Sequence, residues 1–511
     1  MGQAPTSRRY DVSDQLVMSL LSNRTLPLYL IGGIVFVLLA TANGAGYRYG
    51  VSDQSFYIPA VARSIDPTLF PLDASLIDAQ GELMIVDEIM AVIAQATGLS
   101  LDMLFLSSYL VTLGMIWAGL ILIGQRVYAS PWAIAALGAA FTMRHRISRT
   151  SANSFEPYFH PRLLAFGLGV LAVAAVLHRR TWLAVALVAT SAVIHVTTAL
   201  WFTVLIGVAL AIREPRFRRI AAGGVAVTAT TLLWAITFGP LQDVLVIMDD
   251  TWLQAVASKD SLFATDWPVW AWVANLGLLA LLWWAHGTRV RRQEVTAEDS
   301  ALVWSASALV ALFLITLPFV AAGFSLAVQL QIARVFWLVD FLALVYVIGA
   351  MSGPRASTTR AAVVACALLA LSLGRGTYVI LVEHPERSLF EIHLPDAPWD
   401  KAMHWIARQP SDVHVLADPG HAWKYGTSVR VSARRDVFLE EVKDSALAIY
   451  SHDVAVRFVE RAPLLKNFPS LTVEQAHALA NRYDLDYLVT EAYLALPVVY
   501  RNTKFGIYSL R

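Results

Sequence analysis

The stretch LPLYLIGGIVFVLLATANGAGYRYGVSDQSFYIPAVARSIDPTLFPLDASL, residues 26–76, decides the class of this protein. It begins with an apolar run of about 20 residues, enough to cross the hydrocarbon core of a bilayer. It then changes abruptly into a loop rich in aromatic and acidic side chains. The polar segment before the run is too long for the start of a cleaved signal peptide, and no small-residue cleavage site follows it. We therefore predict that the run is a retained first membrane span.

The whole chain has the composition of a membrane protein. Of its 511 residues, 57% are hydrophobic and only 15% are charged, whereas soluble domains carry roughly 25% charged residues. The mean hydropathy is +0.57. We predict a mainly α-helical, polytopic transmembrane bundle of about eleven spans, of which the two short ones, 130–143 and 182–195, are tilted, re-entrant or buried among other helices. The predicted spans are 27–46, 101–123, 130–143, 162–178, 182–195, 197–212, 218–238, 268–286, 300–322, 330–350 and 361–381.

Basic and acidic connections alternate along these spans, which predicts the topology. Eleven spans place most of the arginine-rich connections on one side, together with the N-terminus, which we predict to be cytoplasmic. The opposite connections are acidic, and the C-terminus lies with them outside. One outer connection breaks the rule because it carries Arg144, Arg146 and Arg149.

From about residue 383 the periodicity changes, and we predict a boundary between a membrane domain, 1–382, and a small extracytoplasmic α/β domain, 383–511. Strands are expected at 413–419, 429–439 and 485–490, helices around Trp399–Ile406 and after Thr472, and a hairpin at the end of the chain. The domain has no Gly-rich phosphate loop and no nucleophile elbow, which favours an accessory or lid role.

The first outer loop, 47–100, contains the strongest candidate for chemistry, Asp53. Because it follows directly on the first span, its carboxylate is expected near the membrane surface, where it can serve as a general base or hold a metal ion. Its other expected role is to cap the helix that residues 54–64 can form. The rings of Tyr47, Tyr49, Phe56 and Tyr57 around it can stack on sugars or anchor the loop at the interface.

The chain resembles the C-type (GT-C) membrane glycosyltransferases in this loop, in its many spans and in its C-terminal α/β domain. The phrases SDQSFYIPAVARSIDPTLFPLD, HPRLLAFGLGVLAVAAVL, HVTTALWF and QIARVFWLVDF are similar to those of uncharacterised bacterial members. The resemblance implies transfer of a sugar from a polyprenyl-phosphate donor to an acceptor outside the plasma membrane, with Asp53 as base or metal ligand. Many members have two adjacent acidic residues, but here Gln54 follows Asp53, which leaves open whether a divalent metal ion is a cofactor.

The second outer connection places Glu156, His160 and Arg162 just before a span. Arginine offers a planar fork of donors that suits a lipid phosphate, and His160 can donate to the phosphate or relay a proton. The alternative is interfacial packing, with Glu156 paired to Arg162.

Three further residues lie at or within predicted spans. His195 separates two apolar runs and is either functional or a packing residue bonded to a neighbouring carbonyl. Gln331 and Arg334 are three residues apart and are expected on one helix face, with an external partner for Arg334 such as a lipid phosphate or an acidic loop residue. Asp250, Lys259 and Asp266, in another outer loop, are candidates for an acceptor cleft.

Three functional classes remain: a glycosyltransferase, a non-catalytic protein that binds lipid-linked glycan or serves in assembly, and a transporter. The transporter ranks last because no inverted repeat is visible and the charged residues cluster at outer span ends. A net charge of +1 excludes a general attraction to nucleic acid. The single cysteine, Cys366, excludes a disulfide framework and a cysteine-based metal site. The expected partners are a polyprenyl-phosphate-linked sugar and membrane lipids.

Overall fold

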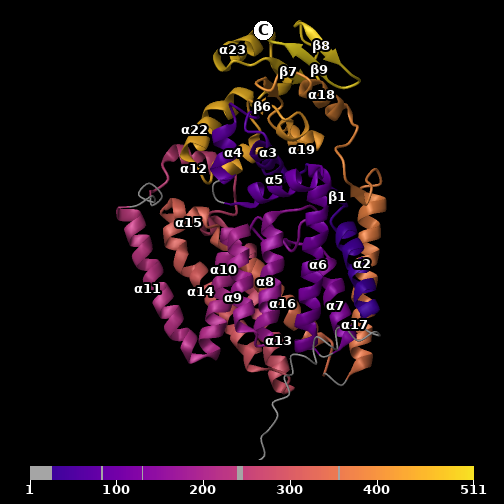
Figure 1. The fold of residues 1–511 in the computed structure, drawn as a ribbon, viewed down its shortest axis with the longest axis vertical. Helices are drawn as coiled ribbons and strands as arrows, with labels where there is room; N and C mark the ends of the chain where they lie inside the picture. The colour runs from indigo at the N-terminus through magenta and orange to yellow at the C-terminus, as the bar shows by residue number, and fades with distance from the viewer. Residues whose placement is uncertain (1–25, 82–83, 129, 239–245, 355–356) are drawn as a thin grey trace, which may run out of the picture.

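The computed structural model describes residues 26–81, 84–128, 130–238, 246–354 and 357–511. A bundle of long helices forms the larger part of the molecule, and a smaller domain that contains a sheet covers one end of it (Figure 1). The predicted cytoplasmic segment before residue 26 lies outside the described residues.

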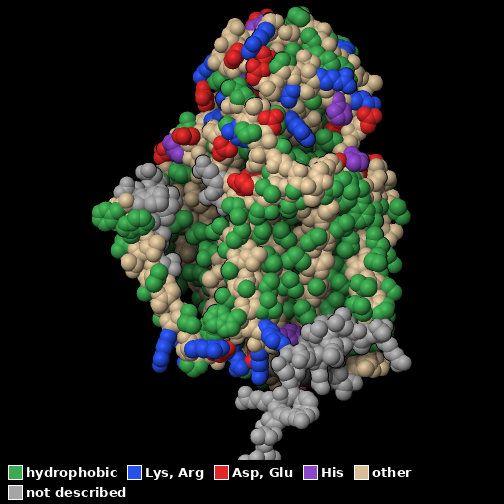
Figure 2. All heavy atoms as spheres, in the orientation of Figure 1, with side chains coloured by type: hydrophobic (Ala, Val, Ile, Leu, Met, Phe, Trp, Pro, Cys, Tyr) green, Lys and Arg blue, Asp and Glu red, His purple; other side chains and the backbone are tan. Residues whose placement is uncertain are grey.

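The bundle is that of a multi-pass membrane protein. Among the described residues, seven helical segments are long and apolar enough to cross a membrane, and each of the eleven predicted runs coincides with a helix. Figure 2 shows a broad belt of hydrophobic side chains around the bundle, with Lys and Arg gathered at the end remote from the C-terminal domain. The helices are α2 (Leu26–Asn43), α6 (Leu101–Val127), α7 (Pro131–Thr142), α8 (Pro161–Leu177), α9 (Thr181–Ile194), α10 (Val196–Arg213), α11 (Pro215–Thr237), α13 (Val269–Arg291), α14 (Ala297–Ala321), α16 (Val335–Met351) and α17 (Thr358–Tyr378).

The connections that are predicted to lie outside form a layer of short elements between the bundle and the C-terminal domain (Figure 1). The first loop folds into α3 (Gln54–Ile65), α4 (Ala74–Gly81) and α5 (Val86–Thr97), so it is mostly helical. The connection that breaks the charge rule forms a small hairpin from β2 (Arg146–Ile147) and β3 (Ala152–Asn153). Another outer loop contains α12 (Asp250–Val256).

The C-terminal region contains a five-stranded mixed sheet of order β6-β5-β7-β9-β8. Strand β5 (His414–Ala417) runs parallel to β6 (Asp436–Val437) and β7 (Tyr487–Thr490), whereas β9 (Gly506–Ser509) is antiparallel to β7 and β8 (Val498–Arg501). The sheet packs against α18 (Pro398–Ala407) and α23 (Val473–Tyr483). The predicted opening of α23 at Thr472 is confirmed by a capping box, in which the side chains of Thr472 and Gln475 each accept a backbone N–H.

One predicted strand is wrong. Residues 429–439 were expected to be extended, but Val429–Ser432 form the short helix α20 and only Asp436–Val437 form a strand. The Ser428 hydroxyl accepts the backbone N–H of Arg430 and so caps that helix, which overrides the β propensity of the valines.

The first outer loop is bound to the C-terminal region by buried charges. Asp73 of the loop lies 2.7 Å from Arg430, whose guanidinium also donates two hydrogen bonds to Asp444, at 2.6 and 3.2 Å. All three side chains are almost fully buried. Strand β1 (Tyr47–Arg48) also pairs in parallel with β4 (Phe390–Glu391). The domain boundary at 382/383 remains a prediction. The first outer loop, although it precedes that boundary in the chain, is also bound to the C-terminal region.

Candidate functional site

A cavity of about 220 Å³ opens where the bundle meets the C-terminal region. Six of the seven predicted site residues line it: Asp53, His160, Arg162, His195, Gln331 and Arg334. The rest of its lining comes from the first loop, from other outer connections and from the C-terminal region: Phe56, Tyr57, Ser151, Lys259, Ser261, Val442, Lys443, Ala446, Ile449 and Tyr450.

Asp53 points into this cavity and does not cap α3. It occupies the N-cap position, but its backbone is helical and its side chain accepts no capping hydrogen bond. The carboxylate instead accepts a hydrogen bond from Lys443 Nζ at 2.8 Å and lies 3.2 Å from His160 Nε2. Burial raises the pKa of Asp53, but the Lys443 ammonium and the His160 hydrogen bond outweigh it and hold the pKa well below its usual value. Asp53 is therefore ionised at neutral pH.

The tautomer of His160 follows from its two partners. Its Nδ1 accepts the backbone N–H of Arg162 at 3.0 Å, which caps the start of α8. The proton is therefore on Nε2, which donates to Asp53. Burial and the Arg162 guanidinium lower the pKa of His160, so the neutral ring acts as a donor that orients Asp53.

Arg162 is held by Glu156, which lies outside the cavity lining. The guanidinium is 3.1 Å from the Glu156 carboxylate, and both side chains are buried. Glu156 also accepts hydrogen bonds from Asn153, at 3.1 and 3.2 Å, and from Arg144, at 3.4 Å. The pairing considered from the sequence is therefore present, and Glu156 positions Arg162 instead of lining the cavity beside it.

Gln331 and Arg334 both line the cavity, but not from one helix face as predicted. Gln331 has a left-handed backbone (φ 49°), Ile332–Arg334 form a 3₁₀ turn, and α16 begins only at Val335. Gln331 donates a hydrogen bond to the Tyr450 hydroxyl at 2.7 Å. Arg334 Nε is buried and has no hydrogen-bond partner within the described part of the chain. The left-handed residue and the 3₁₀ turn interrupt the helix just before α16. Because of this interruption, the side chains of both Gln331 and Arg334 line the cavity.

His195 lines the cavity, where a functional role for it stays a prediction, and its ring bonds a backbone N–H instead of the neighbouring carbonyl that was expected. It separates α9 from α10, and its Nδ1 accepts the backbone N–H of Thr198 at 3.3 Å. The ring lines the cavity, with its centroid 6.4 Å from that of His160. Capping thus fixes the orientation of the ring.

Lys443 and Tyr450 were not identified from the sequence. Both come from the C-terminal region, and no motif marks them, because only folding places them beside a loop near the start of the chain. Lys259 was a candidate for an acceptor cleft and does line the cavity, whereas Asp250 and Asp266 do not. Burial and the neighbouring Lys443 ammonium lower the pKa of Lys259 to about 8.

The charges in the cavity suit an anion and do not suit a divalent metal ion. Two arginines and two lysines line it, against the single carboxylate of Asp53. That carboxylate already contacts an ammonium and an N–H donor, whereas Ca²⁺ and Mg²⁺ require several free oxygen ligands. Among the described residues, no three His, Cys, Asp or Glu side chains lie together as a metal site. We therefore assign no chemical step to a metal.

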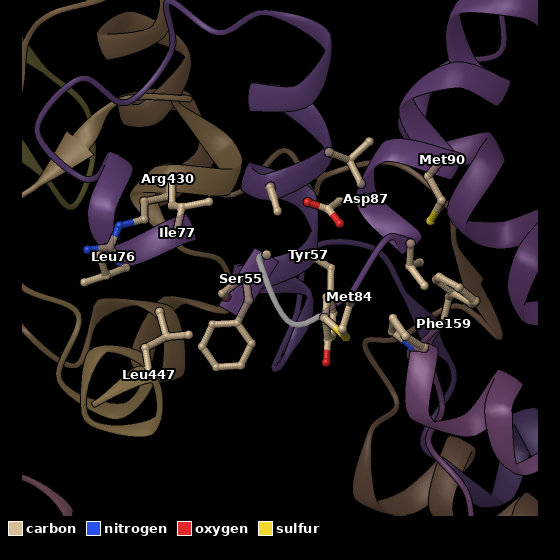
Figure 3. Close-up of a pocket in the computed structure, with 16 residues that line it drawn as sticks. Ser55, Tyr57, Leu76, Ile77, Met84, Asp87, Met90, Phe159, Arg430 and Leu447 are labelled. Atoms are coloured by element: carbon tan, nitrogen blue, oxygen red, sulfur yellow. The ribbon is translucent and has the colours of Figure 1, made fainter. Parts of the chain in front are cut away.

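A second cavity also borders α3 and is mostly apolar. Figure 3 shows Ile77, Met84 and Met90 around it, with one carboxylate, Asp87, among them. Burial and the neighbouring Glu88 raise the pKa of Asp87 to about 7. Its one cationic residue, Arg430, is neutralised by Asp73 and Asp444. It therefore lacks the excess positive charge of the first cavity.

No protein-family model matches the sequence, and no curated protein is significantly similar to it. Two similar solved structures are both of an oligosaccharyltransferase from Archaeoglobus fulgidus. One is AglB in complex with an inhibitory peptide and a dolichol-phosphate, with 12% identity and a TM-score of 0.41. The other is the apo form, with 12% identity and a TM-score of 0.37. Each comparison covers 92% of this chain and 70% of the other. A likeness at this level assigns neither a family nor a function.

Proposed function

We propose that this protein is a membrane glycosyltransferase that transfers a sugar from a polyprenyl-phosphate donor to an acceptor. The observation that carries the proposal is the unpartnered Arg334 Nε beside Arg162, in a cationic cavity at the end of a membrane bundle. A buried guanidinium N–H without a partner costs free energy unless an acceptor such as an anion occupies the site. At that position a lipid with a phosphate headgroup keeps its chain in the bilayer and brings its phosphate to the arginines.

The charge of the cavity also suits the reaction. In the donor the phosphate is a diester with one negative charge. When the acceptor oxygen bonds to the anomeric carbon, the bond from that carbon to the phosphate oxygen breaks, and the lipid phosphate leaves with the electron pair and a second charge. Arg162 and Arg334 stabilise that developing charge. Asp53, oriented by His160, takes the proton of the acceptor hydroxyl as the new bond forms.

The C-terminal region contributes to the same site. Lys443 is 2.8 Å from Asp53, and Tyr450 binds Gln331, which lies close to Arg334 in the chain. The concentration of Lys and Arg at the opposite end of the bundle supports an extracytoplasmic C-terminal domain (Figure 2). The proposed location is a bacterial plasma membrane, with the N-terminus in the cytoplasm and the acceptor outside.

One observation favours a second candidate, a non-catalytic protein that binds lipid-linked glycan. Lys443 and His160 both contact the Asp53 carboxylate, one on each oxygen, and an acceptor must share or displace these contacts. Substitution separates the candidates. A catalytic Asp53 predicts that Asp53→Asn lowers sugar transfer by about 10²–10⁴-fold with normal amounts of folded protein. The matched control is Asp66→Asn, since Asp66 is an exposed carboxylate of the same loop. The binding candidate predicts that Asp53→Asn is silent.

Donor binding is tested by native mass spectrometry of the full chain, extracted gently from its own membrane. We expect a co-purifying polyprenyl phosphate that is lost in Arg334→Gln. It should be retained in Arg291→Gln, because Arg291 is an exposed residue at the last turn of α13. A preparation that keeps ordinary phospholipids but contains no polyprenyl phosphate would contradict the proposed donor.

A further inference from the structure

A groove of about 820 Å³ lies at the carboxyl ends of two parallel strands in the C-terminal sheet. Asp418 follows β5 directly and Glu491 follows β7 directly, and both line the groove. The chain leaves β5 towards β6 on one side and leaves β7 towards β9 and β8 on the other. Neighbouring parallel strands with such opposite exits form a topological switch point, where ligands of open α/β sheets bind.

An unusually exposed aromatic side chain borders this groove. Trp423, on α19 (His421–Tyr425), is 84% exposed, although indole is among the largest apolar side chains and its exposure to water is unfavourable. It does not face lipid, because it belongs to the sheet-containing region. A flat, exposed indole at a ligand-binding edge suits the C–H face of a sugar ring.

The polar groups of the groove are paired, so its charge is nearly balanced. Lys424 forms an ion pair with Asp418, and Lys504 lies 3.6 Å from Glu491. The Tyr425 hydroxyl donates to Glu491 at 2.8 Å. Such pairs offer donors and acceptors to sugar hydroxyls but leave no excess charge for a phosphate. The groove thus differs from the cationic cavity around Asp53.

Helix α21 (Glu441–Leu447) connects the two sites. Another cavity, which does not include Asp87, shares Asp418 and Lys424 with the groove. This cavity extends from the groove as far as Glu441. The next two residues of the helix, Val442 and Lys443, line the cavity of Asp53. A chain-like ligand held in the groove therefore ends beside the helix that carries Lys443.

We propose that this groove binds a neutral oligosaccharide, the distal part of a glycan acceptor, by stacking a sugar ring on Trp423 and bonding its hydroxyls to the half-exposed Lys424, Glu491 and Lys504. The acceptor role rests on the proposed function, but oligosaccharide binding does not. The acceptor would then be a growing glycan whose end is presented to Asp53.

The test uses the purified full-length chain and isothermal titration with linear hexasaccharides of glucose, mannose, arabinose and N-acetylglucosamine. We expect one of them to bind, with about tenfold weaker affinity in Trp423→Ala and near-normal affinity in Trp423→Phe. Tyr493→Ala is the matched control, because Tyr493 is equally exposed (84%) but does not line the groove. Asp53→Asn should also bind normally, so that a failure of catalysis is separable from a failure of this site.

Three outcomes overturn the proposal. One is that none of the hexasaccharides binds. Another is equal weakening in Trp423→Ala and Tyr493→Ala. The third is competition by an unstructured Ser/Thr-rich peptide that binds more tightly than any hexasaccharide and depends on Trp423, which would assign the groove to a polypeptide.

Discussion

The carboxylate of Asp53 lies 2.8 Å from the ammonium of Lys443, 390 residues later in the chain. This contact joins a loop next to the first span to a short helix of the C-terminal region. It also sets the protonation state of the proposed base, because Lys443 is the nearby charge that most lowers the pKa of Asp53.

Lys443→Gln should therefore raise the pKa of Asp53. The depressed pKa means that Asp53 stabilises the fold above its ordinary pKa and that this contribution is lost as the pH falls through the depressed value. Without Lys443 both this loss and the acid limb of sugar transfer should move to higher pH. The measurement is the pH profile of transfer in Lys443→Gln and in Lys401→Gln, a half-exposed lysine of the same region that is paired with Asp396. An unchanged acid limb would show that Lys443 does not tune Asp53.

Lys259 should make donor binding sensitive to alkaline pH. Because its pKa is lowered to about 8, the amine loses its proton as the pH rises through that value, and the cavity loses one positive charge. We expect the affinity for a polyprenyl phosphate to fall above about pH 8 in the wild type. Lys259→Arg should remain charged and keep its affinity. If the two proteins lose affinity in parallel, Lys259 is not the titrating group.

Two arginines that join the first loop to the C-terminal region should differ in their effect on stability. Arg430→Met leaves the buried Asp444 without its arginine and leaves Asp73 with Arg457 alone, and it should cost about 3–5 kcal/mol. Arg48→Met breaks a partly exposed pair with Glu391 at 3.0 Å and should cost less than about 1 kcal/mol. Thermal unfolding of the purified variants measures both. Equal losses would mean that burial does not set the strength of this junction.

Glu440 should make the junction between the first outer loop and the C-terminal region less stable at alkaline pH. Burial raises its pKa to about 7 despite the nearby Arg430. A raised pKa means that the protonated carboxyl stabilises the fold below the ordinary pKa, and that this contribution disappears as the pH rises through about 7. The loss is at most about 3 kcal/mol. Glu440→Gln should reduce this dependence between pH 5.5 and 8, with a remainder from Asp87, whose pKa is also raised to about 7, whereas Glu441→Gln, at an exposed neighbour, should retain it in full. Identical melting profiles in the two variants would refute the assignment.

The bundle was predictable because membrane insertion leaves a strong local signal. About 20 successive apolar residues mark a span wherever they occur, and all eleven predicted runs are helices. Residues 429–439 were harder to predict, because three valines and a phenylalanine favour a strand while the local cap at Ser428 starts a helix. The break before α16 was also invisible, since Gln331 lies in a sequence that otherwise continues as a helix.

A multi-pass helical membrane protein with a C-terminal α/β region was predictable from the amino-acid sequence alone, and so was the unusual position of the polar residues at span ends. Hydrophobic length and charge at membrane depth are properties of short segments, so no tertiary structure is needed to see them. Which of these residues contact one another depends on the folded arrangement of the chain. In the folded protein Asp53 contacts Lys443 and does not cap its helix. Glu156 lies behind Arg162, and Trp423 lies at the switch point of the sheet. These are contacts between segments far apart in the chain, and they depend on packing that no local pattern encodes.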